Sequence, residues 1–338
     1  MCQAFDQNKS HWVNWGLAIL LSLLFSTLSL SWWLFNTKVI DIALAKEIFW
    51  QYQLIIWCAA VIVGGALGMS GAVLQVVLRN PLADVSILGI LSGSQFVGLL
   101  LLFILPSYIS RLSYYSYALF LTACVIGAML VLLLFMLVIF TQKSLTNITV
   151  IIFLGVGISA VFSALTALIM SFSRAETLQQ ITLWQFGGFL NVSWLQLTLL
   201  ILVSCVFFAF AIKNHQAFDM LSLGETEAML MGVDVKRLLV WLVITLAFLV
   251  ACIVSIAGPI AFLGLAAPHI ARFLLSTNKM KVLLIASFLC GASLMLISQW
   301  LSQSIAYPMI IPVGIITALL GAPFLVFLVI RELKTNGV

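Results

Sequence analysis

Long, uninterrupted runs of apolar residues dominate this chain and leave few folds open to it. The run from Trp12 to Phe35 is one example, and similar runs recur along most of the 338 residues. A transmembrane helix needs about 20 consecutive apolar residues, whereas a transmembrane β-strand alternates apolar and polar residues and gives a much weaker signal. The pattern therefore predicts an all-α polytopic membrane protein.

Composition excludes the common soluble classes. Charged residues make up 7% of the chain and apolar residues 64%, whereas soluble domains carry about 25% charged and about 45–50% apolar residues. A soluble enzyme, a disordered chain and a DNA-binding domain are thus excluded. The six cysteines are scattered without a CxxC pair, so we interpret them as small apolar residues rather than as a disulfide or metal framework.

We expect about ten spans within one transmembrane domain that covers residues 1–338. They lie near residues 12–35, 51–78, 86–105, 116–140, 147–170, 193–212, 238–257, 260–275, 282–303 and 308–330. The first run is too long for the apolar core of a signal peptide, so we expect a signal anchor that stays. Gly258-Pro259 divides the long run from 238 to 275 into two pieces, because proline interrupts a helix. The second piece is short and need not cross the membrane fully.

Basic residues indicate the orientation of the chain. An even number of spans puts both termini on one side, and with the termini inside, eleven of the fifteen basic residues lie in inner segments. The positive-inside rule therefore predicts cytoplasmic termini and a long cytoplasmic loop at 213–237. The remaining basic residues, predicted to be external, are Lys38, Lys46, Arg111 and Arg174.

Few ionisable side chains fall inside the predicted spans. The spans contain no Asp, Glu or Lys, and only His269 and Arg272 depart from an uncharged interior. Ion-coupled carriers normally use an intramembrane carboxylate or similar polar site, and membrane enzymes need a nucleophile or a metal cluster. The phosphate-binding pattern GxxxxGK[ST] is missing as well. These features favour a passive path driven by a partner chain, with no catalytic or metal-binding residue, over an ion-coupled secondary carrier.

Two polar segments interrupt the apolar pattern on the predicted cytoplasmic side. Arg79-Asn80-Pro81 fits an ordinary turn with Arg79 reaching to water, although Asn80 can also cap a helix that begins at Pro81. In the loop at 219–235, Ser222 has the capping-box spacing from Glu225, and Gly232 would end that short helix. Such a helix could lie on lipid or dock in a groove on a cytoplasmic protein.

Small residues recur at helical spacing in two of the predicted spans, where they let helices approach closely. In the second span they are Gly64, Gly65, Gly68 and Gly71, and in the tenth Gly314, Ala318, Gly321 and Ala322. The first set predicts packing on a neighbouring helix. The second fits either packing or a helix that faces a pore or a second subunit. The prolines and glycines of 258–272 predict broken helices, with His269 as a packed histidine.

Four ordered segments together resemble the FecCD-type permeases of ABC importers. They read SGAVLQVVLRNPLAD at 70–84, LSLGETEAMLMGVDV at 221–235, GPIAFLGLAAPHIAR at 258–272 and IPVGIITALLGAPF at 311–324. The segment WQFGGF at 184–189 also looks like a family element. The resemblance covers roughly residues 50–330. It implies the type II ABC importer permease fold, with about ten spans, in a bacterial cytoplasmic (inner) membrane.

The resemblance also implies partners. They are a second permease subunit, identical or paralogous, two cytoplasmic ATPases that hold ATP and Mg, and an external binding protein. This chain itself is expected to hold no cofactor and no nucleic acid. The implied ATPase-coupling residues are Leu221, Ser222, Leu223, Gly224, Glu225, Ala228 and Gly232. A path between the two permeases is implied, with Gly155, Gly157, Ser159, Pro312, Gly314, Thr317 and Gly321 as pore- or dimer-facing candidates.

The chain departs from the family at its predicted outer end. The family often carries Arg-Leu-Pro-Arg at the outer start of the second span, where this chain has Gln53, Leu54, Ile55 and Ile56. Neutral Gln299, Gln303 and Ile310 stand where relatives often carry Asp, Arg and Glu. Outer arginines of relatives can pair with the binding protein, so we expect Lys38, Lys46, Arg111 and Arg174 to take that place. Ferric siderophore is the expected substrate because it is the family's commonest cargo, and haem, cobalamin and molybdate stay open.

Overall fold

The computed structural model describes residues 49–105, 114–141, 148–189, 192–306 and 309–336, and within these ranges every regular element is a helix. The longer helices are α3 (Leu54–Val77), α4 (Ile90–Ile104), α6 (Tyr114–Thr141), α7 (Ile148–Ser171), α9 (Trp194–Lys213), α12 (Val235–Ala257), α13 (Leu263–Leu275), α14 (Met280–Ser304) and α15 (Val313–Asn336). The shorter ones are η1 (Phe49–Gln53), η2 (Val85–Leu88), α8 (Ala175–Gln185), α10 (His215–Leu223) and α11 (Glu225–Leu230).

Each predicted span from 51–78 onward corresponds to one of the longer helices, and the span at 12–35 lies outside the described residues. Six helices are long and apolar enough to cross a membrane, and α4, α13 and α15 carry shorter apolar stretches. The largest delays relative to the predicted starts are those of α4 and α15. The 3₁₀ turn η2 and Gly89, with φ +73°, delay α4 to Ile90, and α15 starts only after Pro312.

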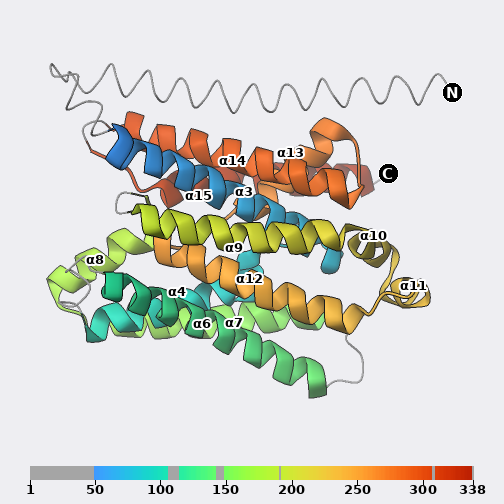
Figure 1. Cartoon of the computed structure of the whole chain (residues 1–338), viewed down its shortest axis with the longest axis horizontal. Coiled ribbons are helices and arrows are strands. Elements are labelled where there is room, and N and C mark those ends of the chain that lie inside the picture. The colour runs from blue at the N-terminus through green and yellow to red at the C-terminus, as the bar shows by residue number, and fades with distance from the viewer. Residues whose placement is uncertain (1–48, 106–113, 142–147, 190–191, 307–308, 337–338) are drawn as a thin grey trace.

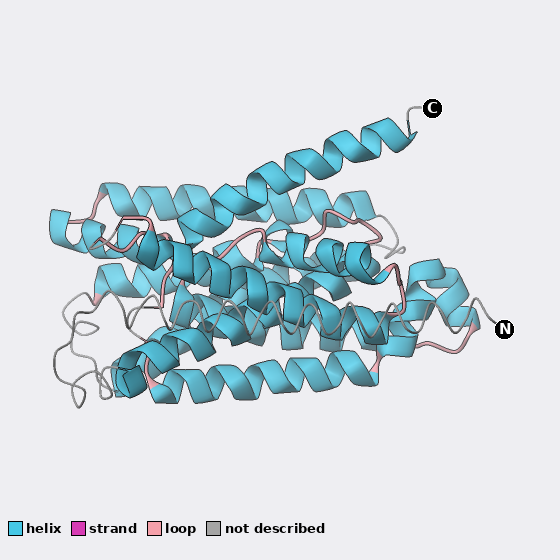
Figure 2. Ribbon diagram, turned by 90° about the horizontal axis from the view of Figure 1, so that it is seen from above, coloured by secondary structure: helices cyan, strands magenta, loops and turns pink. Residues whose placement is uncertain are grey.

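The long helices run side by side and place the short helices at the two ends of the bundle. Figure 1 shows α8 at one end and the α10–α11 pair at the other. The helix α8 lies between the predicted spans 147–170 and 193–212. Figure 2 shows α15 running obliquely away from the other helices toward the C-terminus.

Glycines bring α3 against α14 and α13 with backbone touching backbone. A Cβ placed on Gly64 would collide with the carbonyl oxygen of Gly291 in α14, and one on Gly71 with the carbonyl oxygen of Gly264 in α13. A Cβ on Gly68 would collide with the carbonyl oxygen of Ser287. The predicted packing face of small residues is therefore confirmed, and α3 lies in the centre of the bundle.

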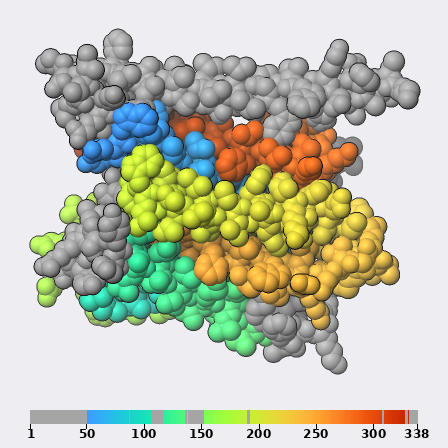
Figure 3. Space-filling model, in the orientation of Figure 1, coloured from blue at the N-terminus to red at the C-terminus, as the bar shows by residue number. Residues whose placement is uncertain are grey.

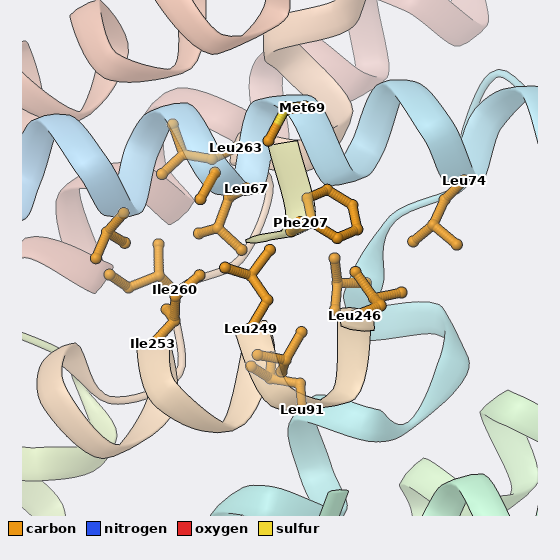
Figure 4. Close-up of a cluster of buried hydrophobic side chains, with 14 of the residues drawn as sticks. Leu67, Met69, Leu74, Leu91, Phe207, Leu246, Leu249, Ile253, Ile260 and Leu263 are labelled. Carbon is orange, nitrogen blue, oxygen red and sulfur yellow. The ribbon is translucent and has the colours of Figure 1, made fainter. Parts of the chain in front are cut away.

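Large apolar side chains fill the space on the other side of α3. Phe207 of α9 is fully buried. Figure 4 shows its ring between Leu67 and Met69 of α3 and the side chains of Leu246 and Leu249 of α12. These residues belong to one continuous apolar core. The core ties the N-terminal helices to the helices that follow the 213–237 loop.

Gly71→Ala should lower the free energy of unfolding by about 3 kcal/mol, because the added methyl group forces two backbones apart. Gly157→Ala in α7 is the matched control, since a Cβ there meets nothing within 4 Å. Its effect should stay within about 1 kcal/mol, and helix propensity makes it stabilising. Reversible unfolding in mixed detergent micelles measures both. Equal effects of the two substitutions would contradict the close backbone contact.

Candidate functional site

The α10–α11 pair projects from one end of the bundle, as the yellow and gold atoms of Figure 3 show. Its apolar side chains divide between two sides. Leu221 and Ala228 are buried with Val235 in a small cluster that packs on Val77 of α3. The side chains that face outward form what we name the distal patch: Leu223, Met229, Leu230 and Met231, with Leu230 84% exposed. An anchored helix pair with an exposed apolar patch is suited to dock on another protein.

The predicted capping box at Ser222 is wrong. The helix α10 already begins at His215, so Ser222 lies in its last turn, where its Oγ donates a hydrogen bond to the carbonyl oxygen of Asp219 at 2.6 Å. Burial of Phe218 and Leu221 holds this earlier helix in place. Gly224, with φ +156°, then breaks the chain direction, and Glu225 opens α11 as a second helix.

Gly232 ends α11, as predicted. Its N–H donates to the carbonyl oxygen of Met229 at 2.9 Å, and the N–H of Val233 donates to that of Ala228 at 3.0 Å. This pair of bonds is the Schellman motif, which requires a left-handed residue at the glycine position. Gly232 supplies it with φ +88°.

The turn favoured from sequence at Arg79-Asn80-Pro81 is confirmed, and no helix begins at Pro81. The N–H groups of Arg79 and Asn80 close α3 by donating to the carbonyl oxygens of Val76 and Gln75, both at 3.1 Å. Arg79 is exposed and takes φ +43°, a conformation that non-glycine residues seldom adopt. The Asn80 side chain accepts from the N–H of Leu82 at 2.9 Å, which closes an Asx turn instead of capping a helix.

Asp84 is a buried carboxyl group that the sequence interpretation missed. Its side chain is 6% exposed and accepts a hydrogen bond from Ser86 Oγ at 3.1 Å. It also accepts from the backbone of Phe262, and a Cβ on Gly264 would collide with its Oδ1. Asp84 thus lies at the start of α13. The sequence does show an Asp at the end of the 70–84 segment. Because this Asp lies between two predicted spans, however, its position suggests a loop and not a buried contact.

Asp84 meets a need that the short helix α13 creates. The first N–H groups of a helix have no partner within that helix, and no water is available in a bilayer to replace one. Phe262, the N-cap residue of α13, has φ +70° and makes no side-chain cap. A carboxyl group from another segment therefore supplies the acceptor. Burial raises the pKa of Asp84, while hydrogen bonds from Val85, Ser86 and Phe262 act in the opposite direction.

Polar contacts to α3 and a ring contact to α15 hold the rest of α13. Arg272 Nη1 donates to Gln75 Oε1, and Gln75 Nε2 donates to the carbonyl oxygen of Leu265 at 3.4 Å. His269 Nδ1 lies 3.0 Å from the same carbonyl oxygen, and its ring meets Phe324 edge-on. The packed role predicted for His269 is confirmed. Among the described residues no three His, Cys, Asp or Glu side chains gather closely enough to hold a metal ion.

The pore- or dimer-facing candidates fall into two groups. On α7, Gly155 is buried, Ser159 Oγ donates to the carbonyl oxygen of Ser86 at 3.5 Å, and Gly157 is exposed. Much of the remaining α7 surface is also uncovered within this chain, with Phe153 71% exposed. The candidate role of the α7 residues toward a path or a second subunit stays a prediction.

The candidates at the start of α15 contact their own chain. Pro312 immediately precedes the helix, and Thr317 Oγ1 donates to the carbonyl oxygen of Gly314 at 3.0 Å. A Cβ on Gly314 would collide with the carbonyl oxygen of Phe186, and one on Gly321 with the side chain of Phe262. The glycine face of α15 therefore packs against its own chain, which was one of the two predicted alternatives. Leu319, which is 65% exposed, lies on a part of α15 that this chain does not cover.

Two of the residues that depart from the family pattern meet where α3 begins and α14 ends. Gln53 Nε2 donates to Gln303 Oε1 at 3.3 Å, and Gln53 is 4% exposed. Of the predicted binding-protein contacts, Arg174 is exposed at the N-cap of α8. Lys38, Lys46 and Arg111 lie outside the described residues.

Comparison with known proteins gives one consistent result. The sequence matches the model of the FecCD transport family over residues 16–331. It is 31% identical over 290 residues to the vitamin B12 import system permease protein BtuC of Vibrio cholerae, covering 86% of this chain and 85% of the relative. It is 32% identical over 281 residues to the hemin transport system permease protein HmuU of Yersinia pestis, covering 81% and 80%.

A solved structure agrees with the sequence relatives. It is described as an inward-facing conformation of a metal-chelate type ABC transporter. Its chain superposes with a TM-score of 0.81 at 30% sequence identity, covering 94% of this chain and 99% of that one. The helix arrangement described above is therefore the arrangement of that transporter chain.

Gly232→Val should unfold the end of α11, because a left-handed backbone costs a non-glycine residue about 1–2 kcal/mol and a β-branched one more. Lys236 and Arg237, exposed just beyond the turn, would then be cut faster by trypsin under native conditions. Gly232→Asn is the control, because asparagine tolerates this conformation. Equal cleavage rates for wild type and Gly232→Val would show that the turn does not hold the loop.

Asp84→Asn should become more stable relative to wild type as pH rises. A carboxyl group whose pKa is raised by folding stabilises fully below its unfolded value, about 3.9, and loses that contribution as pH rises through the folded value. Asparagine stays neutral and escapes the loss. Thermal unfolding in detergent between about pH 4 and pH 8 measures the difference. A difference that is constant over this range would show that burial does not disfavour the charged form of Asp84.

Proposed function

The chain belongs to the FecCD transport family and is a multi-pass permease of the ABC importer class, and we propose that it forms half of the translocation path of a ferric siderophore importer in a bacterial inner membrane. The observation that carries the importer role is the distal patch. It is apolar, exposed, and held by buried contacts to the central helix α3.

In this proposal the energy comes from outside the chain. Two cytoplasmic ATPases hold ATP and Mg, and each docks on the α10–α11 pair of one permease. The buried side chains Leu221 and Ala228 anchor the pair, while Leu223 and Leu230 fill an apolar groove on the ATPase. The Gly224 break between the helices lets both present side chains to the same partner. The chain itself hydrolyses nothing and holds no cofactor.

The proposed topology has about ten spans and both termini in the cytoplasm. The positions of α8 and α10–α11 at opposite ends of the bundle support it (Figure 1). So do the exposed basic residues around the inner end, which are Lys213, Lys236, Arg237, Lys279 and Lys281. Under the positive-inside rule such a cluster marks the cytoplasmic face.

We place the path between this chain and a second permease, identical or paralogous. The uncovered faces of α7 and α15 support this, since large apolar side chains such as Phe153 and Leu319 need lipid or another chain to cover them. Exposed Gly157 would allow a close approach of backbones there. An external binding protein delivers the substrate to the α8 end, where exposed Arg174 is a candidate contact.

A ferric siderophore is a bulky metal chelate, and the metal-chelate type of the structurally similar transporter supports this substrate class. A second candidate class comes from the relatives named for vitamin B12 and hemin, which are also metal chelates. The neutral Gln53–Gln303 pair leaves no formal charge at this outer position of α3 and α14. Selection among chelates is therefore assigned to the binding protein.

The importer role predicts that Leu230→Glu weakens ATPase binding by roughly 30-fold or more, the effect of losing about 2 kcal/mol at a central apolar contact. Leu183→Glu is the matched control, because Leu183 is 58% exposed on α8 at the other end of the bundle. The affinity is measured between detergent-solubilised permease and the ATPase that co-purifies with the wild-type chain. Equal affinities for the two variants would contradict docking on the distal patch.

The substrate is tested in proteoliposomes with the wild-type complex. Binding protein loaded with ferrichrome should raise ATP hydrolysis above the basal rate. Stimulation only by protein loaded with hemin or cyanocobalamin would keep the importer and replace the siderophore. Failure of the wild-type chain to bind any ATPase would overturn the importer itself.

A further inference from the structure

Hydrogen bonds between elements hold both ends of α14. At its inner end, the backbone N–H of Met280, the first residue of α14, donates to Asp219 Oδ1 of α10 at 2.8 Å. At its outer end, Ser302 Oγ donates to the carbonyl oxygen of Ile311, and the N–H of Ile311 donates back to the carbonyl oxygen of Ser302 at 3.0 Å. Ile311 directly precedes Pro312 and the start of α15. The helix therefore joins the α10–α11 pair to α15.

The hydrogen bond between Met280 and Asp219 is unusual because its acceptor comes from another helix. A helix N-terminus is normally capped by the residue just before it, and Lys279, the N-cap residue of α14, makes no side-chain cap. The acceptor comes from α10 instead, 61 residues away in sequence. Met280 is fully buried. The first N–H group of α14 thus depends on a side chain of α10, one of the two helices that carry the distal patch.

The helix between these two ends is stiff. Its 25 residues correspond to about 37 Å at a rise of 1.5 Å per residue. Contact of Gly291 with the backbone of Gly64 in α3 guides it along its middle. Beside it, α10 is held by Phe218 and Leu221, both buried. A continuous set of contacts therefore connects α10 through α14 to the start of α15, and a displacement of α10 can pass along it.

We propose that Asp219 is a positioning residue that transmits movement of the α10–α11 pair to α14 and, through Ser302 and Ile311, to α15. The proposal rests on the proposed function, in which an ATPase moves that pair. Asp234 offers a comparison within the same loop. Its Oδ1 also accepts from a backbone N–H, that of Arg237 at 3.1 Å, but it caps its own helix α12. Only the Asp219 bond joins two elements.

The test measures movement of α15 in the assembled complex of permease and ATPase. Cysteine replaces Leu319, which is 65% exposed on α15, after Cys2 and Cys205 are changed to serine. The alkylation rate with a fluorescent maleimide is compared without nucleotide and after trapping with ATP and vanadate. We expect trapping to change the rate in the wild-type background. Asp219→Ala should lose most of that change while binding the ATPase normally.

Three variants separate transmission from a loss of stability. Asp219→Asn keeps an acceptor oxygen and should keep the nucleotide response. Asp234→Ala removes a local cap and should keep it too. At the outer end Ser302→Ala should lose the response, whereas Ser304→Ala should keep it, because Ser304 Oγ donates within α14 to the carbonyl oxygen of Trp300 at 2.7 Å.

The Asp219–Met280 and Ser302–Ile311 contacts act in series. The double variant Asp219→Ala/Ser302→Ala should therefore lose no more of the nucleotide response than the single variant with the larger loss. A wild-type response in Asp219→Ala, or equal losses in Asp219→Ala and Asp234→Ala, would overturn the proposal. So would a Leu319→Cys background that shows no response to trapping. If Asp219→Ala does not assemble, the Ser302→Ala and Ser304→Ala pair decides. Failure of the wild-type chain to bind the ATPase is a separate result and counts against the proposed function.

Discussion

The contact of backbone with backbone along α3 is the constraint on which the rest of the structure depends. Helices in a bilayer gain little from burying apolar surface against each other, because lipid is equally apolar. Close approach and polar contacts must hold them together instead. At Gly64 and Gly71 the missing side chains allow α14 and α13 to touch α3 directly. This places the start of α13 beside Asp84 and aligns α14 with α10.

The position of α13 beside α3 and Asp84 allows the helix to be broken within 258–275. A helix that starts inside the protein leaves N–H groups without partners, and the short α13 has this difficulty at Phe262. Asp84 reaches its start from the turn after α3, and Gln75 and Arg272 link its later turns to α3. Each of these polar groups lies within reach only because Gly71 and Gly264 bring the two backbones together.

Sequence patterns are sufficient to predict the long helices but not the contacts between helices. Apolar runs locate the longer helices between α3 and α15, and the Gly232 turn follows from local chemistry alone. The helix that was expected to begin at Ser222 starts earlier, because burial of Phe218 outweighs a capping pattern. Local sequence places Asp84 and Asp219 in loops and gives no sign of their contacts, since their partners Phe262 and Met280 lie far away in sequence.

The two ends of α14 differ in the chemistry of their contacts, and burial explains the difference. A hydrogen bond to a charged group is stronger than one between neutral groups, but burying the charge has a large desolvation cost. Asp219 is only partly buried, so it can use a carboxylate to hold Met280. At the C-terminal end of α14, Gln53 and Ser302 are buried, and the contacts there use amides, a hydroxyl and the backbone. A carboxylate at this end would need a buried cation beside it. The neutral contacts avoid that need and still fix α14 to α3 and to the start of α15.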